Sequence, residues 1–161
     1  MTSETLLTND QPLRFKIIRP VYEILTVNDN AAQYFEPLEA ISSSDHVIRL
    51  FDFLRRETRE HFWAAHLDSK NKLLCLDPVS TGSLNASIVH PREVYKSALL
   101  SSAAAIIFVH NHPSGDPTPS REDLELTTRL KDASDLLGIR LLDQVIIGND
   151  RHHSFADSGI L

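Results

Sequence analysis

The residues of this sequence best suited to chemistry are two histidines, followed by a serine and an aspartate. His110 and His112 are two positions apart, and Asp123 comes three positions after Ser120. Two neutral imidazoles and one carboxylate form the protein ligand set of a catalytic zinc ion, with a fourth position left to water. Bound zinc lowers the pKa of that water from about 15.7 to about 7, which makes it a nucleophile at neutral pH. The pattern therefore predicts a Zn²⁺ site with His110, His112 and Asp123 as ligands.

The surrounding segments predict how these side chains would be positioned. Segment 103–109 is short, apolar and uncharged, which is typical of a buried strand. Since side chains alternate across a strand, the two histidines are expected on one face and Asn111 on the other. The proline-rich loop 113–119 should be tight, and a helical pattern begins at Ser120. We expect Asp116, inside this loop, to stabilise the turn and not to bind metal.

Each part of this pattern also has an ordinary structural interpretation. A His-x-His pair alone is weak support for a metal site. Ser120 and Asp123 also form a common helix-capping arrangement. The complete pattern, with a buried strand before it and a helix after it, favours the metal site.

The sequence from His110 to Asp123 resembles the JAMM motif of the JAB/MPN metallopeptidases, which is His-x-His, seven residues and Ser-x-x-Asp. The variant His-Asn-His-Pro-Ser-Gly-Asp-Pro-Thr-Pro-Ser is similar to that of the RadC family, as are segments 84–94 and 141–148. The resemblance extends from about residue 40 to the C-terminus. It implies a zinc-dependent hydrolase that cleaves a peptide or isopeptide bond in a peptide or protein substrate.

The resemblance also implies further catalytic residues. In JAMM enzymes a glutamate just before an upstream strand acts as the general base, and Glu60, immediately before His61, is the matching position. Glu57, one helical turn earlier, is the competing candidate, and both have a second interpretation as solvated charges at a helix end. The family implies that Ser120 donates a hydrogen bond to the oxyanion formed when water attacks a carbonyl group.

The spacing of apolar residues predicts one α/β domain with a mixed sheet between helices. The expected helices span 44–59, 91–99 and 120–137, and the expected strands span 61–67, 72–76, 80–89, 103–109, 141–147 and 153–155. The resemblance implies the same architecture, a single MPN domain with a curved mixed sheet flanked by helices. We assign this domain to residues 40–161, and residues 1–39 to a lead segment with one or two edge strands within 14–27.

Composition narrows the classes of function. The chain has 161 residues, of which 42% are hydrophobic, and a formal net charge of −6. This charge gives no long-range attraction to nucleic acid, so we expect the chain alone not to bind it. No apolar stretch is long enough to span a membrane, and the first residues lack the features of a secretory signal. Together with a single cysteine, Cys75, these features predict a cytoplasmic protein of unspecified oligomeric state.

Two other functions compete with hydrolysis. One is an accessory role in DNA repair, in which the metal is structural or vestigial, and the other is a scaffold without activity. Full-length RadC proteins carry an N-terminal helix-hairpin-helix region that this chain is too short to hold, and many have Asp-His where this chain has Asp143-Gln144. The acidic charge and the intact ligand set favour the hydrolase.

Overall fold

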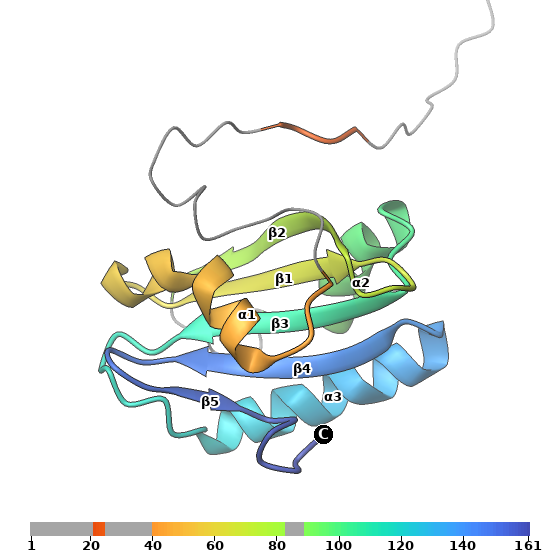
Figure 1. Ribbon diagram of the computed structural model, residues 1–161. Coiled ribbons are helices and arrows are strands. Elements are labelled where there is room, and N and C mark those ends of the chain that lie inside the picture. Colours follow the sequence, from red (N-terminus) through yellow and green to blue (C-terminus); the bar gives the residue numbers. More distant parts are fainter. Residues whose placement is uncertain (1–20, 25–39, 83–88) are drawn as a thin grey trace, which may run out of the picture.

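A mixed five-stranded sheet forms the centre of the computed structural model, which describes residues 21–24, 40–82 and 89–161 (Figure 1). The strands are β1 (His61–Leu67), β2 (Leu73–Thr81), β3 (Ala105–Asn111), β4 (Arg140–Ile147) and β5 (His152–Ser154). They lie in the order β2-β1-β3-β4-β5, and only the β3–β4 pair is parallel. The expected α/β fold with a mixed sheet is therefore confirmed.

Helices cover both faces of this sheet (Figure 1). They are α1 (Ser44–Leu50), the 3₁₀ helix η2 (Asp52–Arg56), α2 (Pro91–Leu100) and α3 (Arg121–Leu137). Alternate residues of β3 enter two separate apolar cores. Phe108 packs in the core beneath α2 and α3, whereas Val109 packs in the core beneath α1 and η2. Burial on both faces explains why β3 is continuously apolar up to its histidines.

The expected single helix over 44–59 is wrong. α1 ends at Leu50, and the chain continues as the 3₁₀ helix η2 after Phe51, whose φ of −109° and ψ of 18° are not helical. Phe51 and Leu54 are both buried in the same core. A 3₁₀ helix has three residues per turn, so it brings residues three apart onto one side, which suits this pair.

The hairpin formed by β1 and β2 is longer than expected. β2 continues past residue 76 to Thr81, which pairs with His61, and a register shift accommodates Pro78 on this outer strand. Residues 80–81 of the expected strand 80–89 therefore belong to β2, and residues 83–88 lie outside the described residues. The edge strands expected within 14–27 also lie outside them, except for residues 21–24, which form no strand.

The parallel pair β3–β4 is joined by α3, because parallel neighbours need a crossover connection. Both ends of α3 match the expectation. Ser120 is its N-cap, and Gly138 follows its last turn with a φ of 69°, in the left-handed region that favours glycine. β3 extends to Asn111 and not only to residue 109, so the first histidine belongs to the strand itself.

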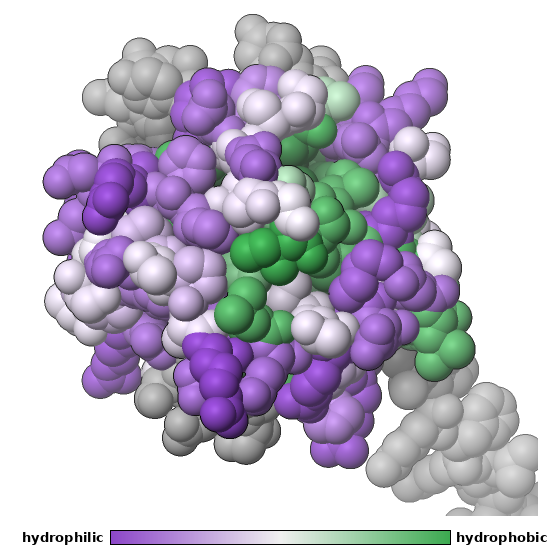
Figure 2. Space-filling model, turned by 90° about the horizontal axis from the view of Figure 1, so that it is seen from below, coloured by the Kyte–Doolittle hydropathy of each residue, from purple (hydrophilic) through white to green (hydrophobic). Residues whose placement is uncertain are grey.

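Part of the surface is apolar. α2 and α3 border a shallow groove that exposes Leu99 and Leu136, the latter with 87% of its surface accessible. Figure 2 also shows apolar residues gathered at the middle of the face seen from below, between polar borders. In the part of the chain that the structure describes, no helix combines the length and the apolar character needed to cross a membrane.

Candidate metal centre

Three side chains converge where the end of β3 meets the start of α3. The Nε2 atoms of His110 and His112 are 3.3 Å apart. Asp123 places Oδ1 3.1 Å from Nε2 of His110 and Oδ2 3.4 Å from Nε2 of His112. Two nitrogens bound to a tetrahedral zinc ion at about 2.0–2.1 Å would be about 3.3 Å apart. The three side chains can therefore hold a metal ion.

The second ring nitrogen of each histidine has a different environment. Nδ1 of His112 lies 2.8 Å from the backbone oxygen of Asp116 and donates its proton there, so the Nε2 lone pair of the neutral ring faces the cluster. The His110 ring is buried and stacks on Phe62 with 5.8 Å between ring centroids. Its Nδ1 has no hydrogen-bond partner among the described residues. Stacking and burial therefore orient His110, whereas a hydrogen bond orients His112.

Asp123 combines a cluster position with a capping position. Ser120 and Asp123 form a capping box, in which the serine hydroxyl also donates to Oδ2 of Asp123 at 2.6 Å. Burial alone would raise the pKa of Asp123, but its hydrogen bonds with the two histidines and Ser120 hold that pKa well below its usual range. When the His112 ring is protonated, its Nε2–H donates to Asp123, and this hydrogen bond raises the pKa of His112 against the effect of burial. The carboxylate is thus held ionised.

A second layer lies behind Asp123. The hydroxyl of Thr127 lies 2.7 Å from the backbone oxygen of Asp123 and 2.8 Å from Oε1 of Gln144 on β4. Gln144 is completely buried. This layer connects the first turn of α3 with the neighbouring strand.

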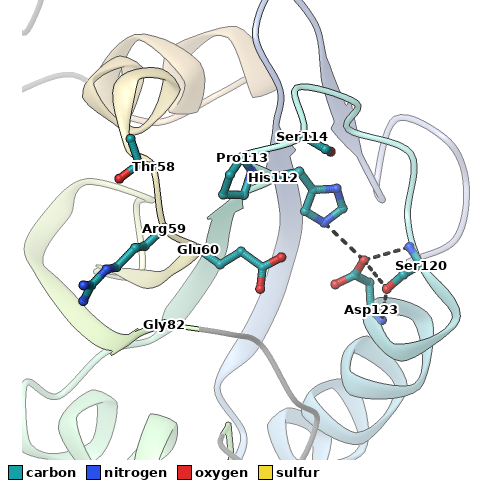
Figure 3. Close-up of a pocket in the computed structure, with 9 residues that line it drawn as sticks. All are labelled: Thr58, Arg59, Glu60, Gly82, His112, Pro113, Ser114, Ser120 and Asp123. Carbon is teal, nitrogen blue, oxygen red and sulfur yellow. Dashed lines mark hydrogen bonds and ion pairs between the residues drawn. The ribbon is translucent and has the colours of Figure 1, made fainter.

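An open pocket of about 640 Å³ lies in front of the cluster (Figure 3). It is lined by Thr58, Arg59, Glu60, Gly82, His112, Pro113, Ser114, Ser120 and Asp123. The carboxylate of Glu60 points toward His112 and Asp123, whereas the side chain of Arg59 points away from them (Figure 3). The charge of Glu60 also contributes to the raised pKa of His112. Glu60 is therefore placed within electrostatic range of the cluster.

The two other acidic candidates lie elsewhere. Glu57 pairs with Nε2 of His61 at 3.3 Å and does not line the pocket. The carboxylate of Asp116 accepts hydrogen bonds from the backbone N–H and the hydroxyl of Thr118, as expected for a turn residue. Of these acidic residues, the structure brings only Glu60 and Asp123 to the pocket beside the histidines.

Sequence reasoning missed the residues that support the loop carrying Glu60. Asn111 bonds the backbone on both sides of Glu60, and Gly82 donates its N–H to the Glu60 carbonyl at 2.8 Å. The position of Asn111 between the two histidines was a usable signal, because it predicted a side chain on the opposite face. The sequence carried no comparable signal for Gly82.

The loop that follows the histidines packs closely on the turn after β4. A Cβ on Gly148 would collide with the backbone oxygen of Gly115 and would lie 2.8 Å from Cδ of Pro117. Arg55 donates to the backbone oxygens of Gly148 and Asn149 at 2.9 and 2.6 Å. η2 therefore supports loop 113–119, the metal loop, through the turn at Gly148.

Comparison with known proteins gives the family. The model of the RadC-like JAB domain matches residues 41–160, which is most of the chain. This chain belongs to the RadC-like JAB domain family. A UPF0758 protein of Geotalea uraniireducens is 48% identical over 151 residues, covering 93% of this chain and 65% of the relative. The UPF0758 proteins of Geobacter sulfurreducens and Methanosarcina mazei are both 52% identical, over 76% and 78% of this chain and 54% and 56% of their own lengths.

Membership in this family accounts for the fold and for the motif, but the names of the relatives state no activity. The chain spans between about half and two thirds of the length of these relatives. As a RadC-like JAB domain, it is compatible with hydrolysis.

Proposed function

We propose that this chain is a zinc-dependent hydrolase that cleaves a peptide or isopeptide bond. The observation that carries the proposal is the convergence of two imidazoles and one carboxylate, at the spacing of zinc ligands, on a pocket that also contains Glu60. His110, His112 and Asp123 would hold the ion and leave a fourth position for water or substrate. When bound, the zinc ion polarises the scissile carbonyl and lowers the pKa of water.

Glu60 is the general base of this proposal. It accepts a proton from the attacking water and donates that proton to the leaving nitrogen as the carbon–nitrogen bond breaks. The products are then a carboxylic acid and an amine. Its carboxylate is directed at the cluster from the opposite wall of the pocket, which supports this assignment (Figure 3).

Ser120 is the proposed donor to the oxyanion. Its hydroxyl donates to Oδ2 of Asp123 in the structure. Stabilising the oxyanion therefore requires this hydroxyl to turn from the carboxylate toward the substrate oxygen.

The alternative, an accessory role in DNA repair with a structural metal, has less support. The net charge of −6 opposes binding to phosphates. The pocket beside the cluster is open, whereas a purely structural zinc site is closed by four protein ligands.

Metal analysis together with the Glu60→Gln and Glu57→Gln variants tests the proposal. Glu57→Gln is the matched control, because Glu57 belongs to the same segment but pairs with His61 outside the pocket. We expect about one zinc per chain in all three proteins when they are purified without chelators. In a peptide and isopeptide library, wild type and Glu57→Gln should cleave the same bonds, and Glu60→Gln should lose about 10²- to 10⁴-fold in rate.

Three results would overturn the proposal. The first is wild-type protein that retains no zinc after refolding with excess metal. The second is zinc-loaded wild type that cleaves nothing in the library, and the third is a Glu60→Gln variant with the wild-type rate.

A further inference from the structure

We propose that Asn111, the residue between the two histidines, is a positioning residue that holds Glu60 beside the metal ligands. The inference rests on the proposed function, because it acts through the general base. Asn111 is 2% exposed, and its side chain leaves β3 on the face opposite the histidines. It therefore contacts neither the ligand atoms nor the pocket, which it does not line.

Both ends of the Asn111 amide bond the backbone that carries Glu60. Oδ1 accepts a hydrogen bond from the N–H of His61 at 2.9 Å. Nδ2 donates to the carbonyl oxygen of Arg59, also at 2.9 Å, with a longer contact of 3.5 Å to the carbonyl oxygen of Glu57. Arg59 and His61 are the immediate neighbours of Glu60, so one side chain holds the backbone on both sides of the general base.

These bonds begin where the backbone pairing of the two strands ends. The β1–β3 ladder stops at Phe62, which pairs with His110. Beyond this pair, the Asn111 side chain supplies hydrogen bonds to the departing chain in place of the backbone. Gly82, the residue after β2, then fixes the carbonyl group of Glu60. The loop is thereby tied to the sheet at three consecutive residues, 59–61.

The chemistry of this contact requires an amide. The carbonyl oxygen of Asn111 faces an N–H donor, and its nitrogen faces carbonyl acceptors. Asparagine offers both groups on a short side chain, whereas the carboxylate of aspartate would set an oxygen against the Arg59 carbonyl. An unsatisfied or repelled buried group destabilises that local arrangement.

The same strand therefore positions both parts of the proposed machinery. The end of β3 presents the imidazoles on one face, and Asn111 on the other face anchors the segment that carries Glu60. Catalysis depends on such placement, because a displacement of about 1 Å costs on the order of 10²-fold in rate. Loss of the amide should therefore impair the general base and leave the metal ligands in place.

Three variants separate positioning from general stability. Asn111→Ala removes both bonds, Asn111→Asp keeps the acceptor and removes the donor, and Val109→Ala is the matched control. Val109 is buried on the same face of β3, two positions away, and its side chain forms no hydrogen bond. We expect zinc affinity to stay within about threefold of wild type in all three, because the ligands lie on the opposite face.

Kinetics and amide exchange then distinguish the variants. We expect kcat to fall about 10²-fold in both Asn111 variants with little change in KM, and to be retained in Val109→Ala. The amide proton of His61 should exchange with solvent faster in Asn111→Ala than in Val109→Ala. Unchanged exchange at His61, or loss of zinc from both Asn111 variants, would overturn the inference.

A double-mutant cycle tests the link to Glu60 directly. If Asn111 acts by placing Glu60, Glu60→Gln should lower kcat much less in the Asn111→Ala background than in wild type. Fully additive losses would show that Asn111 acts independently of the base and would refute the assignment. If zinc-loaded wild type hydrolyses nothing, the proposed function fails, and exchange at His61 alone decides whether Asn111 anchors this loop.

Discussion

Nδ1 of His112 and the backbone oxygen of Asp116 are 2.8 Å apart, and this hydrogen bond closes the metal loop on itself. It commits the Nδ1 proton, so the Nε2 lone pair of the neutral ring faces His110 and Asp123. The ligand geometry is thus built into the fold of the loop. A substitution that displaces this loop should therefore weaken metal binding, even when it changes none of the three proposed ligands.

Asp123→Asn should lower zinc affinity by more than about 100-fold, because a ligand contributes at least as much as the residues that orient it. Asp116→Asn is the matched control, since among the described residues its carboxylate bonds only Thr118 and Arg151, and its backbone still accepts from His112. Zinc at 100 times the wild-type Kd should stabilise wild type and Asp116→Asn by about 2.7 kcal/mol, and Asp123→Asn hardly at all. Competition titration and thermal unfolding provide the two measurements, and equal zinc binding by both variants would refute the ligand assignment.

Gly148→Ala should destabilise the fold by about 1–3 kcal/mol and weaken zinc binding, because its Cβ would displace Gly115 and the metal loop. Gly138→Ala is the control. Its Cβ would meet nothing within 4 Å, so it should cost only about 1 kcal/mol of backbone strain at its positive φ. Urea unfolding and zinc titration of both variants check this, and the expectation fails if Gly138→Ala weakens zinc binding as much as Gly148→Ala.

His66 should make stability depend on pH below 6.5. It is fully buried, with Nδ1 2.9 Å from the Ser101 hydroxyl and 3.3 Å from the Cys75 sulfur. Burial lowers its pKa below 6.5, against the attraction of Asp77. As the pH falls below 6.5, the unfolded chain binds a proton at this residue that the folded chain does not bind, so the free energy of unfolding decreases.

The slope attributable to His66 is at most about 1.4 kcal/mol per pH unit. Urea unfolding between pH 5 and 6.5 should show this slope in wild type and not in His66→Leu. The raised pKa of His112 has the opposite effect on stability and acts in another pH range. Its contribution to the free energy of unfolding is complete below pH 6.5 and is lost as the pH rises above that value. Parallel pH curves for wild type and His66→Leu would contradict the prediction.

DNA binding by this chain should be weaker than a Kd of about 10⁻⁴ M near physiological salt, because its charge of −6 opposes contact with phosphates. Fluorescence anisotropy with single- and double-stranded oligonucleotides, titrated with salt, provides the measurement. Tight binding that weakens steeply with salt would favour the accessory role in DNA repair over the hydrolase.

Local sequence patterns determined the parts of the site that one strand and one helix hold together. The alternation of a strand put His110 and His112 on one face, and Ser120 and Gly138 bounded α3 as expected. These features follow from backbone geometry over a few residues, so the sequence alone was sufficient. The proposed ligand set could be predicted in the same way, because its three residues lie between the end of β3 and the first turn of α3.

Tertiary structure decided what lies far apart in the chain. No periodicity showed that helix 44–59 would break at Phe51, or that the Gly148 turn would support the metal loop. Glu60 could be placed before its strand but not beside the histidines. That placement depends on a hydrogen bond between residues 50 positions apart, from His61 to Asn111. A local pattern specifies which side of an element is buried, whereas only packing of the whole chain specifies which distant backbone meets it.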